Sequence, residues 1–344
     1  MKKIKEKTAD LVLDILKRSV NDYHSGEEIA KQLFVSRATV WKAIRTLKER
    51  GYEIDAVTNR GYRLLHSLDD PDAGKIAKYM REYVNTYHLP DAVLFPGYAD
   101  AVHAYSEVGS TNAVVSTLSG PEKMPVIAVA DRQTGGRGRR GRSFHSPSGS
   151  GIYMSVLLYP DNTFNPSTGF TCMMAVAACF AIRNVLKLQP EIKWVNDLFL
   201  NGKKVAGILT EGNVSVEDNT ISSIVIGIGI NVYCPKDGFP EEIRKTAGCL
   251  LDKESEIKDL RNRLIAGILC EFFHIYRQND NSFVKDYRDL SMLIHEHVRI
   301  TDFSDGSYRY AYVEGIDDQC HLCVRYDNGK KENLSSGEVS VVKY

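Results

Sequence analysis

The N-terminal part of the chain alternates between helical and strand periods. Apolar side chains spaced three and four residues apart predict a helix over residues 8–19. Ser25 and Glu28 form a capping box, in which each side chain can satisfy the other residue's backbone amide, and they open a second, short helix. Ser36 should cap a third helix, whose core side is expected to consist of Val40, Ala43, Ile44 and Leu47.

A hairpin should follow the third helix, which Gly51 ends. Apolar side chains then alternate on either side of an Asn59-Arg-Gly61 turn. Two short helices at a sharp turn, followed by a hairpin, are typical of a winged helix-turn-helix that reads the DNA major groove. The alternative is a small structural unit with a solvated basic face. If this part binds DNA, the contacts should come from Arg37, Thr39, Lys42, Arg45, Arg60 and Arg63.

Longer helices follow a polar break over residues 67–73. Residues 75–87 should form a helix, residues 168–186 a helix that is apolar on nearly all sides and therefore buried, and residues 259–276 a long amphipathic helix. From Val298 to Tyr344 short strands alternate with turns, which predicts a small all-β barrel. We therefore expect domains at residues 1–66, 101–292 and 293–344, with a helix-containing linker at 67–100.

A basic, glycine-rich stretch lies in the middle of the chain. Residues 133–150 read QTGGRGRRGRSFHSPSGS between two strand-like runs, so we expect a mobile loop. Glycine lets backbone amides approach an oxyanion, and arginine offers a fork of donors that matches phosphate or carboxylate. Neither a P-loop nor a dinucleotide-binding glycine fingerprint occurs in the chain. An RGG-like nucleic-acid-binding segment is the alternative interpretation.

Other polar groups stand at the ends of predicted strands. The hydroxyl and amide side chains of Ser110-Thr-Asn112 either cap the next helix or point into a ligand site. Asn201-Gly202 indicates a tight hairpin, after which only one of Lys203 and Lys204 can face inward. An inward lysine beside Asp197 would form a structural ion pair or, together with the basic loop, part of a site in which the acid holds Mg²⁺.

Charge is balanced over the whole chain but not along it. Basic and acidic residues number 44 each, whereas residues 1–66 hold 14 and 9, a net charge of +5 that the remainder offsets with −5. This asymmetry indicates an anionic partner for the N-terminal part. The seven cysteines favour free thiols in a reducing compartment, and the Cys320–Cys323 pair has no second pair nearby that would form a zinc site. The chain has neither a long apolar run nor an apolar leader, so we expect a cytoplasmic protein without membrane contact.

In combination and in this order, several segments resemble those of the bifunctional biotin–protein ligases that also repress biotin operons. The resemblance covers essentially the whole chain. It implies a multidomain α+β fold with an N-terminal winged helix-turn-helix, a central α/β catalytic domain with a mixed sheet of the class II synthetase or lipoate-ligase type, and a C-terminal SH3-like β-barrel. The segments that carry it are Ser110–Asn112, Gly136–Arg142, Lys193–Asp197, Lys204–Leu209 and Gly227–Asn231.

The activity that this resemblance implies is a two-step ligation. The biotin carboxylate attacks the α-phosphate of ATP, which gives biotinoyl-5′-AMP and pyrophosphate, and a lysine of a biotin carboxyl carrier protein then attacks the mixed anhydride. Two anions must meet in the first step, so their repulsion has to be neutralised. The implied small molecules are ATP, Mg²⁺, biotin and biotinoyl-5′-AMP, and the implied partners are the carrier protein, operator DNA and a second copy of the chain.

The resemblance also implies a role for individual residues. The catalytic residues would be Lys204, Arg137, Arg139 and Asp197, of which Asp197 would also bind the metal. The biotin-binding residues would be Ser110, Thr111, Asn112, Gln133, Gly136, Arg137, Arg139, Lys204, Gly227 and Gly229. The nucleotide-binding residues would be Arg137, Arg139, Arg140, Arg142, Phe144, Asn196 and Asn231, with Phe144 standing where the family usually has Trp.

Ordering of the basic loop would also couple ligand binding to DNA binding. Fixing a glycine-rich loop costs about 1–2 kcal/mol per residue, so a second event that needs the same ordered loop becomes more favourable. We therefore expect biotinoyl-5′-AMP to act as a co-repressor that favours a homodimer through the central sheet. Two alternatives are a ligand-gated repressor without ligase activity and a lipoate-type ligase with a DNA-binding appendage. The polar side chains of Ser110–Asn112 and Gln133 favour the ureido ring of biotin over a plain acyl chain.

Overall fold

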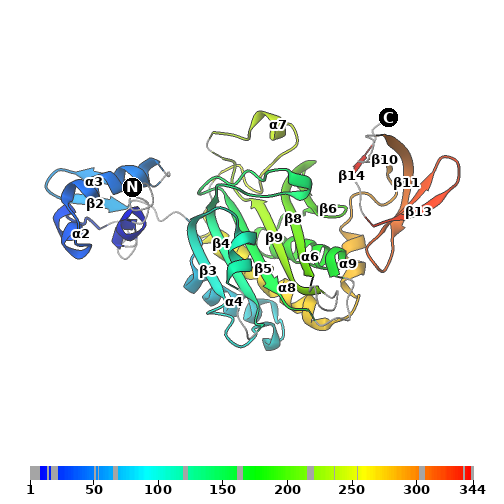
Figure 1. Cartoon of the computed structure of the whole chain (residues 1–344), viewed down its shortest axis with the longest axis horizontal. Helices are drawn as coiled ribbons and strands as arrows, with labels where there is room; N and C mark the ends of the chain where they lie inside the picture. Colours follow the sequence, from blue (N-terminus) through cyan, green and yellow to red (C-terminus); the bar gives the residue numbers. More distant parts are fainter. Residues whose placement is uncertain are drawn as a thin grey trace. The chain divides into compact units, whose positions relative to one another are not determined.

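The predicted capping box opens helix α2 (Gly26–Gln32) in the computed structural model (Figure 1). The Ser25 hydroxyl accepts from the backbone amides of Glu27 and Glu28 at 3.2 and 3.3 Å, and the Glu28 carboxylate accepts from the Ser25 amide at 3.2 Å. The chain forms two compact units, residues 1–70 and 71–344. The structure describes residues 8–13, 15–16, 22–49, 52, 54–64, 69–118, 123–160, 166–214, 221–235, 237–253, 255–301, 307–335 and 338–341.

The N-terminal unit contains the predicted helix-turn-helix. Helix α3 (Arg37–Glu49) begins after Ser36, whose hydroxyl accepts from the Thr39 amide at 3.1 Å. Residues 8–13 and 15–16 are helical as well, while the rest of the predicted 8–19 helix and Gly51 lie outside the described residues. The core side of α3 is as predicted, because the buried residues are Val40, Ala43, Ile44 and Leu47.

The hairpin after α3 also has the predicted position. Strand β1 (Ile54–Val57) pairs antiparallel with β2 (Gly61–Leu64). Asn59 and Gly61 have φ angles of 69° and 99°, and these left-handed conformations suit the two residue types that tolerate them best. A side chain at Gly61 would also collide with the backbone of His24, at 2.0 Å from its carbonyl oxygen.

A seven-stranded mixed sheet forms the centre of the second unit (Figure 1). Strands β3 and β4 run parallel, and every other neighbouring pair is antiparallel, which confirms the predicted mixed sheet. In spatial order the strands are β3 (Val102–Val108), β4 (Val126–Gln133), β5 (Gly151–Leu158), β9 (Ile221–Asn231), β8 (Lys203–Val214), β7 (Asp197–Leu200) and β6 (Glu191–Lys193).

Helices cover both faces of this sheet, because alternate residues of a strand point to opposite sides. On one face Ile127, Val129 and Val156 belong to the main core together with helices α4 (Ala73–Tyr87), α6 (Pro166–Leu186) and α8 (Leu260–Gln278). On the other face the short helix α5 (Thr111–Thr117) packs through Val115 onto Ala128, Leu157 and Val225. The unit also contains helices α7 (Glu241–Arg244) and α9 (Phe283–Asp289) and the 3₁₀ turn η1 (Asp91–Val93).

Helix α6 is the buried helix that its apolar sequence predicts. Within the described residues, Thr168–Leu186 is the one helical stretch that is long and apolar enough to cross a membrane, and 72% of it is buried inside the protein. Its neighbour α8 is fastened to α4 by polar contacts: Asp259 accepts from the Lys75 ammonium at 2.5 Å and from the Tyr79 hydroxyl at 2.8 Å. Helix α4 is therefore part of the core of this unit.

The C-terminal segment of the second unit forms a five-stranded antiparallel sheet. One of its turns lies at Asp327–Gly329, where Gly329 has a φ angle of 81°. In spatial order the strands are β13 (Lys331–Leu334), β12 (Leu322–Tyr326), β11 (Tyr308–Ile316), β10 (His297–Thr301) and β14 (Glu338–Val341). Over the described residues the edge strands β13 and β14 do not pair with each other, so the predicted closed barrel is not confirmed.

The expectation of free thiols is wrong for two of the seven cysteines. Cys234 and Cys249 form a disulfide, and the five other cysteines, all of them described, are free. The sequence gave no sign of the pair, because its partners are 15 residues apart and meet only through the fold. Cys320 is buried and its carbonyl accepts from the Trp194 indole at 2.9 Å, which joins the C-terminal sheet to the central sheet.

Candidate active site

A cavity of about 720 Å³ opens on the α5 side of the central sheet. Its floor is formed by glycines of the two central strands: Gly207 of β8 pairs with Gly229 of β9, and Gly227 pairs with Ser155 of β5. Of the predicted ligand-binding residues, all but Gly136 line this cavity. They are Ser110, Thr111, Asn112, Gln133, Arg137, Arg139, Arg140, Arg142, Phe144, Asn196, Asp197, Lys204, Gly227, Gly229 and Asn231.

Two of the floor glycines make room for side chains of the protein itself. A Cβ atom at Gly227 would lie 2.2 Å from Oδ1 of Asn112, and one at Gly229 would lie 2.4 Å from Cε1 of Phe144. Any larger residue would therefore displace the Asn112 amide or the Phe144 ring. The space next to both glycines is thus occupied by side chains of the chain itself.

The polar end of the cavity is a hydrogen-bonded network at the start of α5. The Thr111 amide donates to Oε1 of Gln133 at 2.9 Å. Ser155 is completely buried; its hydroxyl donates to Oδ1 of Asn112 at 2.6 Å, and its Oγ lies 2.7 Å from the Thr111 hydroxyl oxygen, with which it also shares a hydrogen bond. The Asn112 amide donates in turn to Glu211 at 2.6 Å. Ser110 occupies the N-cap position of α5 without capping it through its side chain.

Sequence reasoning missed Ser155 and Glu211 as members of this network. The run Ile152–Leu158 is apolar except for Tyr153 and Ser155. A serine inside such a buried strand is a signal, readable from the sequence, of a polar partner in the core. Glu211 is harder to find, because only the register of β8 against β9 places it beside Asn112. Removing any one member leaves buried polar partners unpaired, which costs more than the hydrogen bond itself.

A lysine and an aspartate face each other at the other end of the cavity. Asn201 and Gly202 have φ angles of 51° and 73° and form the predicted tight turn between β7 and β8. The Lys204 ammonium approaches Oδ1 of Asp197 at 2.6 Å without the angle of a hydrogen bond, so the contact is an ion pair. Lys203 points elsewhere and donates to the carbonyl of Lys245 at 2.6 Å. The inward lysine of the two is thus Lys204.

The basic loop between β4 and β5 folds back on itself. The Gly138 amide donates to the carbonyl of Arg142 at 2.7 Å, and the Phe144 amide donates to the carbonyl of Gly136 at 2.9 Å. A Cβ atom at Gly136 would lie 2.6 Å from the Phe144 carbonyl oxygen, so this glycine is required for the fold-back. At the tip the 3₁₀ turn η2 (Arg139–Gly141) directs Arg139 toward Asn196, whose Oδ1 accepts at 3.1 Å.

A buried ion pair fixes the root of this loop. Arg261 of α8 has no exposed surface and donates to Oδ1 of Asp131 at 2.7 Å and to the Gly151 carbonyl at 3.0 Å. Asp131 also accepts from the Gly149 amide at 3.0 Å and from the Ser148 hydroxyl. The strand that leads into the loop and the turn that leaves it are therefore tied together. Neither Asp131 nor Arg261 was identified from the sequence.

The electrostatic character of the cavity is strongly cationic. Four arginines of the loop and Lys204 line it, and of these Arg137, Arg140 and Arg142 are exposed to solvent. Burial lowers the pKa of the His145 imidazole, so this cavity residue favours its neutral form. Lys193 and Lys245 line the cavity as well, and the acids among its described lining residues are Asp197 and Glu242. Such a site favours a ligand that carries more than one negative charge.

The predicted DNA-binding residues lie in the other unit. Arg37, Lys42 and Arg45 are exposed on α3, and Arg45 pairs with Glu49 at 3.3 Å. Thr39 is half-buried, with its hydroxyl 2.9 Å from that of Ser36. The guanidinium groups of Arg60 and Arg63 lie over the Tyr23 ring, at 4.2 and 4.5 Å from its centroid. Arg63 also pairs with Asp55 at 2.9 Å, which neutralises part of its charge.

Comparison with known proteins gives the class of this fold. The sequence profile of the biotin/lipoate A/B protein ligase family matches residues 107–231, which include most of the cavity. A helix-turn-helix profile matches residues 9–63, and the profile of the biotin protein ligase C-terminal domain matches residues 293–342. The solved biotin protein ligase from Aquifex aeolicus in complex with biotin and ATP is 25% identical, with a TM-score of 0.58, over 71% of this chain and 99% of that chain.

Whole-length relatives make the class more specific. The bifunctional ligase/repressor BirA of Bacillus subtilis is 35% identical over 266 residues, which are 77% of either chain. The BirA of Escherichia coli is 27% identical over 344 residues, 98% of either chain. The chain therefore belongs to the family of bifunctional ligase/repressor proteins.

Proposed function

We propose that this protein is an ATP-dependent biotin–protein ligase and a DNA-binding repressor of biotin genes. One observation carries the proposal: a single cavity joins a polar, hydroxyl-rich end to an end that holds a lysine and four arginines. An uncharged polar ring with a carboxylate tail fits the hydroxyl-rich end, and the phosphates of ATP fit the end with the lysine and the arginines. The biotin and ATP named for the Aquifex aeolicus ligase support the assignment.

The first step forms biotinoyl-5′-AMP from biotin and ATP. An oxygen of the biotin carboxylate attacks the α-phosphorus, and the bond from that phosphorus to the bridging oxygen of pyrophosphate breaks. Lys204 is proposed to contact both the carboxylate and the phosphoryl oxygens, and Arg137 and Arg139 to bind the phosphates. Charge neutralisation by such fixed donors lowers the barrier when two anions must approach.

The proposed magnesium ligand is Asp197. Its carboxylate is a hard oxygen donor that lines the cavity, and Mg²⁺ is commonly held by one or two carboxylates together with substrate phosphates. The bound ion would supply positive charge to the phosphate oxygens. In the structure the same carboxylate faces Lys204 at 2.6 Å, so metal binding and ligand binding would both separate this ion pair.

The remaining cavity residues are proposed to position the two substrates. Gln133 and the Ser110–Asn112 segment would hydrogen-bond the ureido ring, with Gly227, Gly229 and Gly136 allowing close approach of the backbone or side chains. The nucleotide would be bound by Arg140, Arg142, Phe144, Asn196 and Asn231. In the second step a carrier-protein lysine attacks the acyl carbon, loses a proton and releases AMP.

Repression is proposed to depend on the first step. Biotinoyl-5′-AMP would act as the co-repressor, favour a homodimer through the central sheet and so present two helix-turn-helix units to a palindromic operator. Arg37, Thr39, Lys42 and Arg45 would face the major groove, and Arg60 and Arg63 the DNA backbone. We also propose that the C-terminal segment is an SH3-like barrel, that the domains end at residues 66, 100 and 292, and that the protein is cytoplasmic.

Transfer of labelled biotin to a carrier domain in the presence of ATP and Mg²⁺ tests the ligase. We expect transfer by the wild type and a loss of roughly 10²–10³ in rate for Lys204→Ala, because a group that stabilises transition-state charge is removed. Lys285→Ala is the matched control, since this exposed lysine pairs with Asp289 on α9, outside the cavity. No transfer by the wild type would favour a ligand-gated repressor, and transfer of lipoate but not of biotin would favour a lipoate-type ligase.

A further inference from the structure

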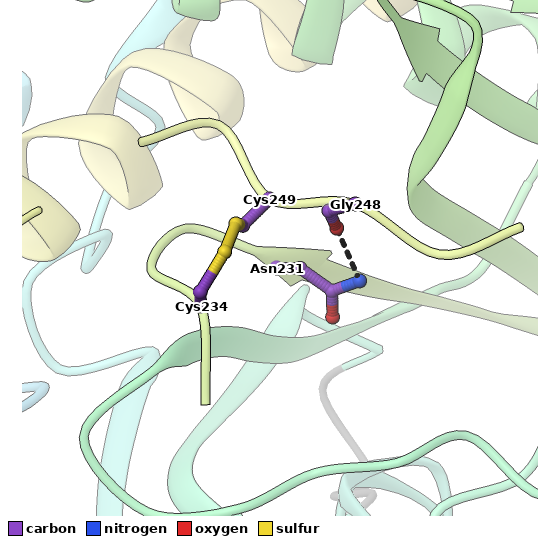
Figure 2. The surroundings of a disulfide bond; sticks show 4 residues. All are labelled: Asn231, Cys234, Gly248 and Cys249. Atoms are coloured by element: carbon purple, nitrogen blue, oxygen red, sulfur yellow. Dashed lines mark hydrogen bonds between the residues drawn. A yellow bond between two sulfur atoms is a disulfide. The ribbon is translucent and has the colours of Figure 1, made fainter. Parts of the chain in front are cut away.

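The disulfide closes a segment that forms one side of the cavity. Cys234 lies three residues after the end of β9, and Cys249 lies beyond α7 (Figure 2). Their Cα atoms are 5.4 Å apart, inside the range that disulfides adopt. We call residues 237–248 between them the outer wall. Its members that line the cavity are Phe239, Glu242, Ile243, Lys245, Thr246 and Ala247.

The outer wall has little packing of its own. Helix α7 is four residues long and buries none of them. Cys234 and the side chains of Glu241, Glu242, Arg244 and Lys245 are exposed. A segment with few buried contacts opens locally at a small fraction of the free energy of global unfolding. Covalent closure of the segment therefore has a large relative effect on how firmly it is held.

The outer wall is attached to the strand that carries the inward lysine. The Lys204 amide donates to the carbonyl of Thr246, and the Gly248 amide donates to the carbonyl of Lys204, both at 2.8 Å. A Cβ atom at Gly248 would lie 2.5 Å from Cβ of Lys203, so the backbone of the outer wall is in close contact with β8 at this point. Movement of the wall would therefore act on the backbone of Lys204 itself.

A second attachment lies immediately beside the disulfide. Nδ2 of Asn231 donates to the Gly248 carbonyl at 2.9 Å, as Figure 2 shows next to the sulfur atoms. The Leu250 amide donates to the carbonyl of Asn231, also at 2.9 Å. The disulfide thus sits at the point where the wall returns to β9, and Asn231 connects that point to the cavity.

We infer that Cys234–Cys249 is a reversible thiol–disulfide site that sets how firmly the outer wall is held against β8 and β9. A dithiol reductant donates the two electrons. One of its thiolates attacks a sulfur of the pair, which expels the other cysteine as a thiolate and leaves a mixed disulfide. The second thiolate of the reductant then attacks the reductant's own sulfur in that bond and expels the first cysteine, so the reductant becomes a disulfide and its two protons pass to the two cysteine thiolates. Cys234 is exposed and Cys249 half-buried, so attack at Cys234 is sterically open.

The expected consequence is a change in nucleotide affinity, and this part rests on the proposed ligase function. The wall bonds to the end of β8 that holds Lys204. The hydroxyl-rich end is built from β3, β4, β5 and α5, and Glu211 joins it from a position seven residues further along β8. Reduction should therefore weaken ATP binding and leave biotin binding nearly unchanged. Cys323 in β12 serves as a comparison, because of the five free cysteines it is the one that is not buried.

The first test counts thiols and measures tryptic cleavage on the full chain. Under denaturing conditions we expect five reactive thiols in air-oxidised protein and seven after treatment with dithiothreitol. Cleavage after Arg244 and Lys245, followed by mass spectrometry, should be about tenfold faster in the reduced native protein. Seven thiols in the oxidised sample, or equal cleavage rates in both states, would overturn the inference. Neither readout needs ligase activity, so both remain valid if ligation fails.

The second test compares variants in adenylate formation. The doubly substituted Cys234→Ser, Cys249→Ser protein should resemble reduced wild type, with a KM for ATP raised about three- to tenfold and a KM for biotin within about twofold. Dithiothreitol should then have no further effect, whereas the Cys323→Ser control should respond as wild type does. A zinc-selective chelator is present throughout, because the Asp252 carboxylate lies within 4.8 Å of both sulfur atoms. A double variant that still responds to dithiothreitol would contradict the assignment.

Discussion

Helix α3 and the basic loop between β4 and β5 are both cationic, but one presents its basic side chains from a rigid helix and the other from a glycine-rich loop. On α3 the basic residues project from a helix whose other side is packed into a core, so their spacing is fixed before any partner arrives. In the loop between β4 and β5 the arginines alternate with glycines, and the loop is held mainly by its own backbone hydrogen bonds and by its buried root. A fixed row suits a long polyanion, whereas a loop that can close suits one small anion. Arginine content alone therefore does not distinguish the two uses.

The largest expected effect comes from a substitution in the basic loop, which should impair biotin transfer without affecting DNA binding. Arg139→Ala should slow biotin transfer by about 10²–10³-fold, because a donor to the developing phosphate charge is lost. DNA affinity in the absence of ligand should stay unchanged. Arg132→Ala is the control, since this exposed arginine of β4 pairs with Glu107 outside the cavity. If both variants lose transfer equally, the effect comes from general charge and not from the loop geometry.

A smaller effect, on DNA affinity, is expected from substitutions on α3. The Lys42→Ala, Arg45→Ala double variant should bind operator DNA about 10–100-fold more weakly, and the slope of log affinity against log salt should fall by about 2. Biotin transfer should be unaffected. Lys31→Ala, which removes an exposed lysine paired with Glu27 on α2, should change neither quantity appreciably. Gel-shift titrations at several salt concentrations measure both; an unchanged slope would show that α3 does not contact phosphates.

Substitution of one serine tests whether the two ends of the cavity act separately. Ser155→Ala removes two hydrogen bonds, worth about 1 kcal/mol together with the partners they leave unpaired, and should raise the KM for biotin about five- to tenfold. The KM for ATP should stay within about twofold. Ser116→Ala provides the control, because it removes an exposed hydroxyl of the same helix, α5, that donates to the backbone carbonyl of Asn112 at 3.0 Å. Equal changes in both KM values would mean that the ends are not independent.

The smallest effect concerns a buried acid that belongs to neither surface. Burial raises the pKa of Glu271, whose carboxyl accepts from Tyr83 and Asn184 and forms no ion pair with a described residue. Its contribution to stability is therefore complete below the ordinary carboxyl pKa and is lost as pH rises through the raised value. Glu271→Gln keeps the accepting oxygen and should flatten the pH dependence of the unfolding midpoint in the range above the ordinary carboxyl pKa. A wild-type midpoint that rises over this range would contradict the sign.

The sequence alone was most informative where a single segment determines the structure. The capping box at Ser25, the buried side of α3 and the Asn201-Gly202 turn follow from local backbone chemistry, and each appears in the structure as predicted. Lys204 and Asp197 also lie together in the cavity, because the tight turn fixes which lysine faces inward.

What the sequence did not reveal depends on pairings between distant segments. Asp131 and Arg261 are 130 residues apart and meet only after β4 and α8 have packed on the same core. Glu211 reaches Asn112 because of the register between β8 and β9, which no local pattern sets. The Cys234–Cys249 bond has the same origin, since it needs the chain to return to the end of β9.

Strands β3 and β4 are the one parallel pair in the described sheet, and this has a mechanical consequence. Parallel neighbours deliver the segments that follow them to the same end of a sheet. The segment that starts α5 and the basic loop therefore leave from adjacent positions, and Gln133 at the end of β4 bonds to both Thr111 and Ser146. One amide side chain therefore holds the start of α5 and the end of the basic loop in a fixed relation. Substitution of hydroxyl residues around it would change which ligand fits the polar end and leave the position of the loop unchanged.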